Sequence, residues 1–124
     1  MIYNKEYKIK YYCDENGESD VVYFIKSLDD KMRAKILKYI EYLRLEAGYL
    51  NEPLSKHISG KIRELRVDFW NHRHRFFYFC AIEKNIIILS GFIKKTSKTP
   101  QKEIEKAEYR LNDCLNNIEK YLYD

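Results

Sequence analysis

The sequence predicts an α+β fold with a helical hairpin near the N-terminus, three antiparallel strands in the middle and a long helix at the C-terminus. Three observations predict this class. Two neighbouring amphipathic segments come first, three segments rich in β-branched and aromatic residues follow across very short turns, and a last amphipathic segment begins at a proline. With one further strand at the start, the order is β-α-α-β-β-β-α, which is typical of layered α+β proteins.

The first strand is predicted at residues 7–12, where aromatic and β-branched side chains dominate. The polar run Asp-Glu-Asn-Gly at 14–17 ends it, because these residues favour turns. Ser19 or Asp20 can then cap a short helix over residues 21–28, since a side-chain oxygen at the N-cap accepts a hydrogen bond from the first turn.

A longer helix is predicted from a cap at Asp29 or Asp30 to about Ala47, and Gly48 supplies its stop. Its apolar residues recur at helical spacing. They are Met32, Ile36, Ile40 and Leu43, with Leu37 and Ala47 widening the stripe. The two helices therefore form a hairpin with one inward face.

Strand-like segments fill the middle of the chain, after an expected loop at residues 51–60 that contains Pro53. The connections between them are so short that we expect an antiparallel meander. Four consecutive aromatic residues at 76–79 indicate a strand buried on both faces. The strands are predicted at residues 62–68, 72–82 and 85–93, with turns at Trp70-Asn71 and at residues 83–85.

The C-terminal helix has a strong start signal, with Thr99 as its cap and Pro100 at its first position. Glu103 and Glu105 lie near the positive end of its dipole. Its inward stripe consists of Ile104, Ala107, Leu111, Leu115, Ile118 and Leu122.

The length of 124 residues suits one domain, which we predict to span residues 1–124. No apolar run approaches the roughly 18 residues that a transmembrane helix needs, and the polar start lacks the core of a signal peptide. Three widely spaced cysteines argue against a disulfide scaffold and a zinc site. We therefore expect a reduced cytoplasmic protein with no membrane partner.

The net charge of +4 is unevenly distributed. Residues 54–98 contain ten basic and three acidic residues, whereas the rest of the chain contains 13 basic and 16 acidic residues. A basic middle between acidic helices favours a local binding site for a polyanion. The alternative is a solvated charged surface with no ligand.

The sequence contains no paired-carboxylate, nucleophile-elbow, P-loop or HExxH pattern. His72 and His74 would project from one strand face as a metal pair does, but no third ligand stands near them. The three acids of the basic segment are too few to hold Mg²⁺. We therefore expect no metal and no cofactor.

Basic side chains are the remaining candidates for chemistry. They are Arg66, Arg75, Lys94, Lys95 and Lys98, with Lys56, His57 and Arg63 nearby. Strand alternation places Arg73 and Arg75 together, on the face opposite His72 and His74.

Such side chains suit RNA cleavage, because RNA carries its own nucleophile, the 2′-hydroxyl. A protein can align that hydroxyl with the adjacent phosphorus and stabilise the crowded phosphate. The arginine fork pairs with two phosphate oxygens. A lysine among cations has a lowered pKa and can serve as a base. Binding without cleavage is the alternative use of the same residues.

Several short motifs follow one another between Leu54 and Ala107. They are LSKHISG at 54–60, ELR at 64–66, RFFYF at 75–79, GFIKKT at 91–96, KTP at 98–100 and EIEKA at 103–107. In this order and spacing they resemble the RelE/ParE toxin superfamily, and most closely its HigB-like, phage-derived branch. Lys61 and Arg63 depart from the branch, which more often has a small or apolar residue and an aromatic there. Tyr121 and Tyr123 do not clearly match the catalytic tyrosine of some relatives.

The resemblance implies two N-terminal helices packed on a twisted antiparallel sheet, and a toxin that cleaves translated mRNA on the ribosome and leaves a 2′,3′-cyclic phosphate. It implies a cognate antitoxin, which we expect to be a helix-turn-helix protein. On this basis we predict catalytic roles for Arg66, Arg75, Lys94, Lys95 and Lys98. We predict RNA contacts for Lys56, His57, Arg63 and Arg73.

Three alternatives remain: a ParE-like inhibitor of DNA gyrase, a non-catalytic nucleic-acid binder of the same fold, and a domain with no activity. The Lys-Lys-x-x-x-Thr-Pro connector at 94–100 favours the HigB-like enzyme. Trp70, at a predicted hairpin tip, can stack on a base or simply cover the hairpin.

Overall fold

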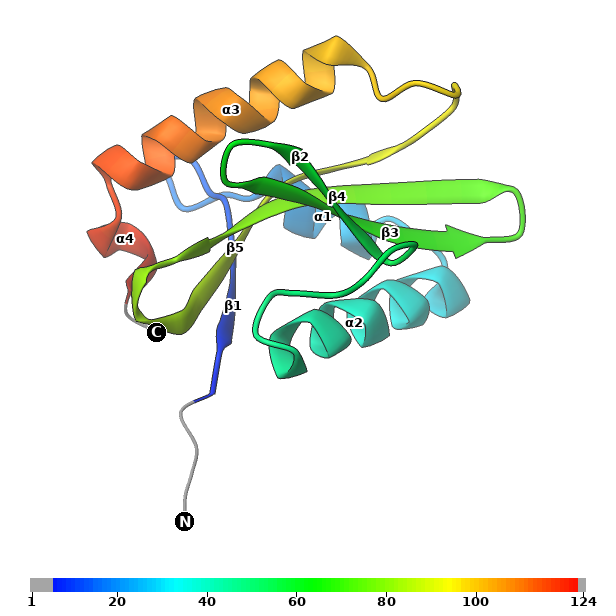
Figure 1. Cartoon of the computed structure of the whole chain (residues 1–124), viewed down its shortest axis with the longest axis horizontal. Coiled ribbons are helices and arrows are strands. Elements are labelled where there is room, and N and C mark those ends of the chain that lie inside the picture. The colour runs from blue at the N-terminus through cyan, green and yellow to red at the C-terminus, as the bar shows by residue number, and fades with distance from the viewer. Residues whose placement is uncertain (1–5, 123–124) are drawn as a thin grey trace.

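A computed structural model describes residues 6–122, in which one five-stranded sheet carries helices on both faces (Figure 1). The α+β class, the N-terminal helical hairpin and the C-terminal helix are confirmed. The elements are β1 (Lys8–Tyr11), α1 (Asp20–Lys26), α2 (Asp30–Leu45), β2 (Ser55–Ser59), β3 (Ile62–Phe69), β4 (His72–Ala81), the 3-10 turn η1 (Ile82–Lys84), β5 (Asn85–Ile93), α3 (Gln101–Asn116) and α4 (Glu119–Leu122).

The sheet has the order β1-β5-β4-β3-β2. Strands β3 to β5 form the predicted antiparallel meander, β2 adds an antiparallel edge strand to it, and β1 pairs with β5 in parallel. The predicted loop at 51–60 is wrong in part, because Ser55–Ser59 pairs with β3 as an edge strand. Its pairing comes from a partner strand rather than from its own polar sequence, so local reasoning missed it.

The N-terminal helices begin at the predicted caps. Ser19 Oγ accepts a hydrogen bond from the Val22 amide, and the Asp29 carboxylate accepts one from the Met32 amide at 2.9 Å. Gly48 follows α2 with a positive φ of 85° and donates its amide to the Leu43 carbonyl, which is the predicted stop.

The start of α3 differs from the prediction. Thr99 is not its cap: Pro100 stands at the N-cap position with extended backbone, and no side chain within residues 6–122 caps the helix. The Pro100 carbonyl accepts hydrogen bonds from the amides of Glu103 and Ile104 instead. The first helical residue is therefore Gln101, one position later than predicted.

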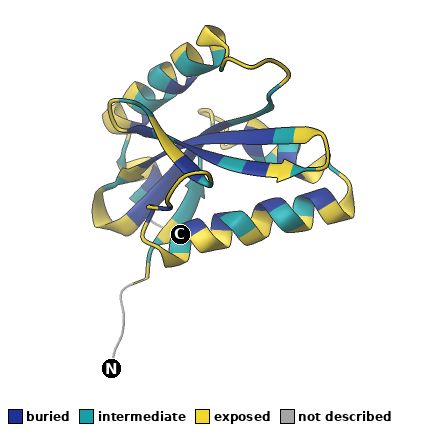
Figure 2. Cartoon of the chain, turned by 45° about the vertical axis from the view of Figure 1, so that its right-hand side comes forward, coloured by how far each residue is buried: buried dark blue, intermediate teal, exposed yellow. Residues whose placement is uncertain are grey.

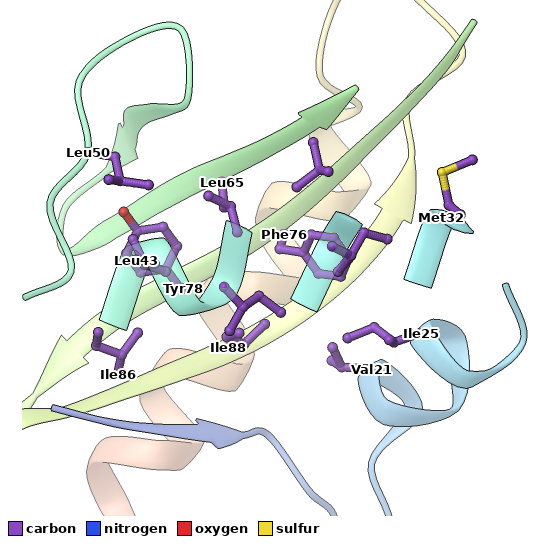
Figure 3. Packing of buried hydrophobic residues seen from close by; sticks show 13 residues of the cluster. Val21, Ile25, Met32, Leu43, Leu50, Leu65, Phe76, Tyr78, Ile86 and Ile88 are labelled. Atoms are coloured by element: carbon purple, nitrogen blue, oxygen red, sulfur yellow. The ribbon is translucent and has the colours of Figure 1, made fainter. Parts of the chain in front are cut away.

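Two apolar clusters lie on the two faces of the sheet. On one face α1 and α2 cover residues such as Leu65, Phe76, Tyr78 and Ile88 (Figure 3). On the other face α3 and α4 cover a second set, which includes Ile62, Phe77, Phe79, Ile87 and Leu89. The aromatic run at 76–79 is thus buried on both faces, as predicted, and exposed residues gather at the turns and the outer helix faces (Figure 2).

A register shift in β5 changes which of its residues face α3. Phe77 pairs with Ser90 and Tyr78 pairs with Ile88, so Leu89 has no partner on β4. Beyond this bulge, Ser90 and Phe92 share the α3 face with Phe77. Within residues 6–122, no helix has the length and apolar character required to cross a bilayer.

Candidate phosphate-binding site on the sheet

Two arginines stand directly opposite each other on the central strands. Arg66 of β3 pairs with Arg75 of β4, and Arg75 pairs with Phe92 of β5. Directly opposed residues of an antiparallel ladder project from the same face. The two predicted phosphate ligands therefore lie side by side on the face that carries α3.

The next row toward the β3–β4 turn adds two more cations. Arg73 pairs with Asp68, and the Lys94 amide donates to the Arg73 carbonyl at 2.7 Å. Lys94 thus extends the ladder by one residue past Ile93 and lies on the same face. We call Arg66, Arg73, Arg75 and Lys94 the basic cluster. In Figure 1 the β3–β4 hairpin that carries three of its residues reaches beyond the start of α3.

His74 points away from the basic cluster, as strand alternation predicted. It is buried under α1, where its ring lies 6.2 Å from that of Phe24, and neither ring nitrogen makes a well-formed hydrogen bond. Burial lowers the pKa of His74, and a weak interaction with the Val67 backbone opposes this shift. His74 is therefore a neutral core residue, while exposed His72 stands beside it with ring centroids 6.3 Å apart.

A buried carboxylate orients Arg66. The side chain of Glu64 is fully buried, and its Oε1 accepts a hydrogen bond from Arg66 Nε at 2.9 Å. Within residues 6–122 the two terminal nitrogens of Arg66 make no hydrogen bond. The contact through Nε therefore fixes the guanidinium and leaves its outer edge available for a phosphate.

Arg75 is held more tightly and is nearly buried. One terminal nitrogen donates to Asp68 at 2.6 Å and to the His74 carbonyl at 3.0 Å. Asp68 is itself more than half exposed. Arg75 is thus fixed by a carboxylate that solvent or a ligand can reach.

Buried polar atoms without partners gather at the same place. Among the described residues they include Glu64 Oε2, Arg75 Nε and Ser90 Oγ. These residues lie on one face in neighbouring rows of the ladder. Buried polar groups are nearly always satisfied in folded proteins, so such a group is typical of a site that binds a polar ligand or water.

The pKa of Lys94 is lowered from its ordinary value. Desolvation is the largest cause, and the positive charges of Arg75, Arg66 and Arg73 add to it. The carboxylate of Glu64 opposes the shift. Lys94 is thus electrostatically coupled to the rest of the basic cluster and is more easily deprotonated than an ordinary lysine.

Three other predicted lysines lie at the margins of the basic cluster. Lys56 of edge strand β2 pairs with Glu64, so it projects from the same face and is exposed. Lys95 and Lys98 are exposed in the connector that follows β5. Among the described contacts, only a hydrogen bond from Thr96 to the Lys98 carbonyl orders this connector.

His57 and Arg63 lie on the other face of the sheet. They pair with each other across β2 and β3, and Arg63 also pairs with Tyr78, which belongs to the α2 side. Arg63 lies over the Tyr49 ring at 4.8 Å and donates to Ser55 Oγ. Its contacts anchor the α2–β2 loop, so the structure does not bring these two predicted RNA ligands to the basic cluster.

The acidic partners Glu64 and Asp68 were absent from the predicted site. The sequence did contain a signal for them, because one acid precedes Arg66 by two residues and the other follows it by two residues in the same strand. Tyr121 is buried and its hydroxyl donates to the Cys13 carbonyl, so it belongs to the core. Tyr123 lies outside the described residues.

A surface hollow of about 840 Å³ lies elsewhere, between the turn after β1 and the exposed side of α3. Asp14, Glu15 and Asp113 contribute to its lining. Three carboxylates repel a phosphate, so the size of this hollow does not make it a rival to the basic cluster for a polyanion.

Comparisons with known proteins agree with the motifs and the fold. A family model described as "Phage derived protein Gp49-like (DUF891)" matches residues 23–112. A double arginine-to-alanine mutant of the E. coli toxin RelE, solved in the free state, has a similar structure with a TM-score of 0.50 and 16% sequence identity. The similarity covers 86% of this chain and 98% of that one. No curated protein matches the chain.

Proposed function

The chain belongs to the phage-derived Gp49-like family and has a RelE-like fold, and from this premise we propose that it is the toxin of a toxin–antitoxin pair. We further propose that it is an endoribonuclease that cuts mRNA on the ribosome. The family and the fold support the first statement, because the structure with the similar fold is that of the E. coli toxin RelE. The basic cluster supports the second.

The proposed reaction uses the 2′-hydroxyl of the RNA as nucleophile. Lys94, as a neutral amine, accepts the proton of that hydroxyl while its oxygen bonds to the neighbouring phosphorus. The bond from phosphorus to the 5′-oxygen breaks, and that oxygen takes up a proton. The products are a 2′,3′-cyclic phosphate and a 5′-hydroxyl. The lowered pKa of Lys94 supports its role as the base.

Arg66 and Arg75 bind the phosphate in this scheme and stabilise the extra negative charge of the pentacovalent transition state. One observation carries the proposal: two opposed arginines, each oriented by a carboxylate, share a sheet face with a lysine of lowered pKa. Oriented donors of this kind stabilise charge that develops during a reaction. In this proposal Arg73 and Lys56, which project from the same sheet face, contact flanking phosphates.

The proposed partner in resting cells is an antitoxin that covers or neutralises the basic cluster. A surface that binds RNA attracts an acidic protein segment through the same charges. We expect a helix-turn-helix protein in this role. Copurification of such a protein with the chain from its native host would support the assignment, and recovery of free chain beside an intact neighbouring gene would oppose it.

The test of the proposed function is induced expression without the partner, followed by primer extension on a translated message with purified ribosomes. We expect growth and translation to stop within minutes, and new 5′ ends to appear in the message only when the protein is present. Broken DNA with intact RNA would favour a gyrase inhibitor instead. Normal growth at confirmed soluble expression would favour a non-catalytic binder.

A further inference from the structure

Trp70 stands at the tip of the β3–β4 hairpin with 87% of its surface exposed. Phe69 and His72 form the last pair of the ladder, so Trp70 and Asn71 make a two-residue turn. The fold gains little from the indole, whose one ring contact within residues 6–122 is with Phe69, edge-on, with centroids 6.2 Å apart. The structure therefore does not support the alternative in which Trp70 packs over the hairpin.

The backbone of Trp70 is also unusual for its side chain. Its φ is +58°, in the left-handed region. Two-residue hairpin turns place Gly, Asn or Asp at such positions, because a bulky side chain is strained there. A tryptophan at this position costs conformational energy and buries little surface, so neither packing nor turn formation accounts for it.

Two cations lie next to the hairpin end that carries this exposed ring. The Asp68–Arg73 pair lies directly behind the pair that closes the hairpin. Lys35 of α2 lies over the Phe69 ring at 5.2 Å and donates to the Asp68 carbonyl. An aromatic side chain beside a positive surface is the arrangement that single-stranded nucleic acids recognise.

We propose that Trp70 stacks on an unpaired base of an RNA whose backbone runs over the basic cluster. This inference rests on the proposed function and adds a base-binding position to it. Trp70 lies four residues along the chain from Arg66, roughly 13 Å at the usual rise of a strand. The stacked base therefore belongs to a nucleotide that flanks the cleaved one, and Trp70 positions the strand rather than taking part in the chemistry.

Trp70 is the single tryptophan of the chain, so its fluorescence reports the proposed contact directly. The probe is a short single-stranded RNA with 2′-O-methyl ribose throughout, which lacks the nucleophile and cannot be cut. We expect this RNA to quench the fluorescence of the full-length protein as it binds. An oligonucleotide of equal length and charge with abasic sites should bind more weakly and leave the fluorescence unchanged.

Substitutions separate stacking from folding. Polarisation of a labelled RNA should show roughly 5- to 150-fold weaker binding for Trp70→Ala, in line with the usual effect of losing one stacked base. Trp70→Phe should retain most of the affinity. Trp70→Gly suits the left-handed backbone, so it should melt no lower than wild type while binding as weakly as Trp70→Ala. Tyr109→Ala removes a similarly exposed ring from α3 and should change nothing.

Saturating RNA binding with unchanged fluorescence, or equal affinity for Trp70→Ala, would overturn the inference. So would an absence of RNA binding, or quenching by the antitoxin protein but not by RNA. These results are separate from the proposed cleavage, which is measured on ribosomes. A chain that binds and stacks but never cuts would retain Trp70 as a base platform and lose the nuclease.

Discussion

Arg66 and Arg75 face each other across the β3–β4 ladder, and each is held by its own carboxylate. Like charges directly opposite each other destabilise a sheet. Glu64 and Asp68 offset this repulsion, and each leaves part of its arginine uncommitted. The protein thus keeps two arginines on neighbouring strands of one sheet face, and each has donor nitrogens that make no hydrogen bond to the described residues.

Loss of either arginine should remove most of the proposed cleavage. Arg75→Ala and Arg66→Ala should each lower the rate by about 10²- to 10³-fold, because each removes a contact that strengthens in the transition state. Arg75→Lys keeps the charge but loses the planar fork, so it should also be impaired. The assay is primer extension on a translated message with purified ribosomes.

The control for these substitutions must be a basic residue to which the described residues give no hydrogen-bond or ion-pair partner. Arg33 of α2 is unsuitable, because it donates to the Leu28 carbonyl at 2.8 Å and to the Lys26 carbonyl at the end of α1 at 3.3 Å, and so ties α1 to α2. Lys31 is exposed on α2, on the other face of the sheet, and Lys31→Ala should cut at the wild-type rate. Wild-type cleavage by folded Arg75→Ala would show that the phosphate site lies elsewhere.

Chelation should not stop the proposed reaction. Its nucleophile is the RNA hydroxyl, its base is a lysine, and arginines neutralise the phosphate, so no step requires a metal. We expect cleavage to persist in EDTA at concentrations where the ribosomes remain assembled, as judged by sedimentation in the same buffer. Loss of cleavage in EDTA with intact ribosomes, and its rescue by Mg²⁺, would contradict this mechanism.

Acid should destabilise the protein through His74. Burial holds the pKa of this ring below its ordinary value of 6.5, so the folded state disfavours the charged form. Above pH 6.5 the ring is neutral in both the folded and the unfolded chain, so its titration does not change the free energy of unfolding. Below that pH the unfolded chain binds a proton more readily than the folded protein does, so the free energy of unfolding falls. The melting temperature of the wild type should therefore fall between about pH 7 and pH 5.

A non-titrating side chain of similar size isolates this effect. His74→Phe can pack on Phe24, and its melting temperature should fall less over the same pH range than that of the wild type. His57→Ala, which removes an exposed histidine from β2, should keep the wild-type dependence. Equal acid sensitivity of His74→Phe and wild type would assign the loss of stability to other groups.

The elements that the sequence predicted well are those with local signals. Asp29 caps α2 through its own side chain, and β5 has the predicted limits Asn85–Ile93 because a turn precedes it and apolar residues fill it. Strand β2 and the parallel position of β1 depend on partners far away in the chain. No local pattern encodes those partners, so both were missed.

The site was predicted in the same uneven way. Alternation along β4 correctly separated Arg75 from His74, since it needs only the period of a strand. The register between strands decides which residues of different strands meet, and it separated His57 and Arg63 from the basic cluster. The same register brought Arg66 opposite Arg75 and Lys94 beside Arg73. Composition could predict a basic surface but not these pairings.

The charges around Lys94 give a test in which two substitutions act in opposite directions. A base must be deprotonated, so the cleavage rate should rise with pH through the pKa of Lys94, which lies below the ordinary 10.5. Arg73 lowers this pKa and Glu64 raises it. Arg73→Ala should therefore move the rising limb of the pH–rate profile to higher pH, and Glu64→Gln should move it to lower pH.

The measurement is the single-turnover cleavage rate on ribosome-bound message, taken for each variant across the pH range that ribosomes tolerate. Lys94→Ala should abolish the limb and lower the rate by about 10²- to 10⁴-fold, the usual contribution of a general base. Glu64→Gln also loosens Arg66, so its maximal rate falls, but only the position of the limb reports on Lys94. If both substitutions leave the limb in place, another group is the base.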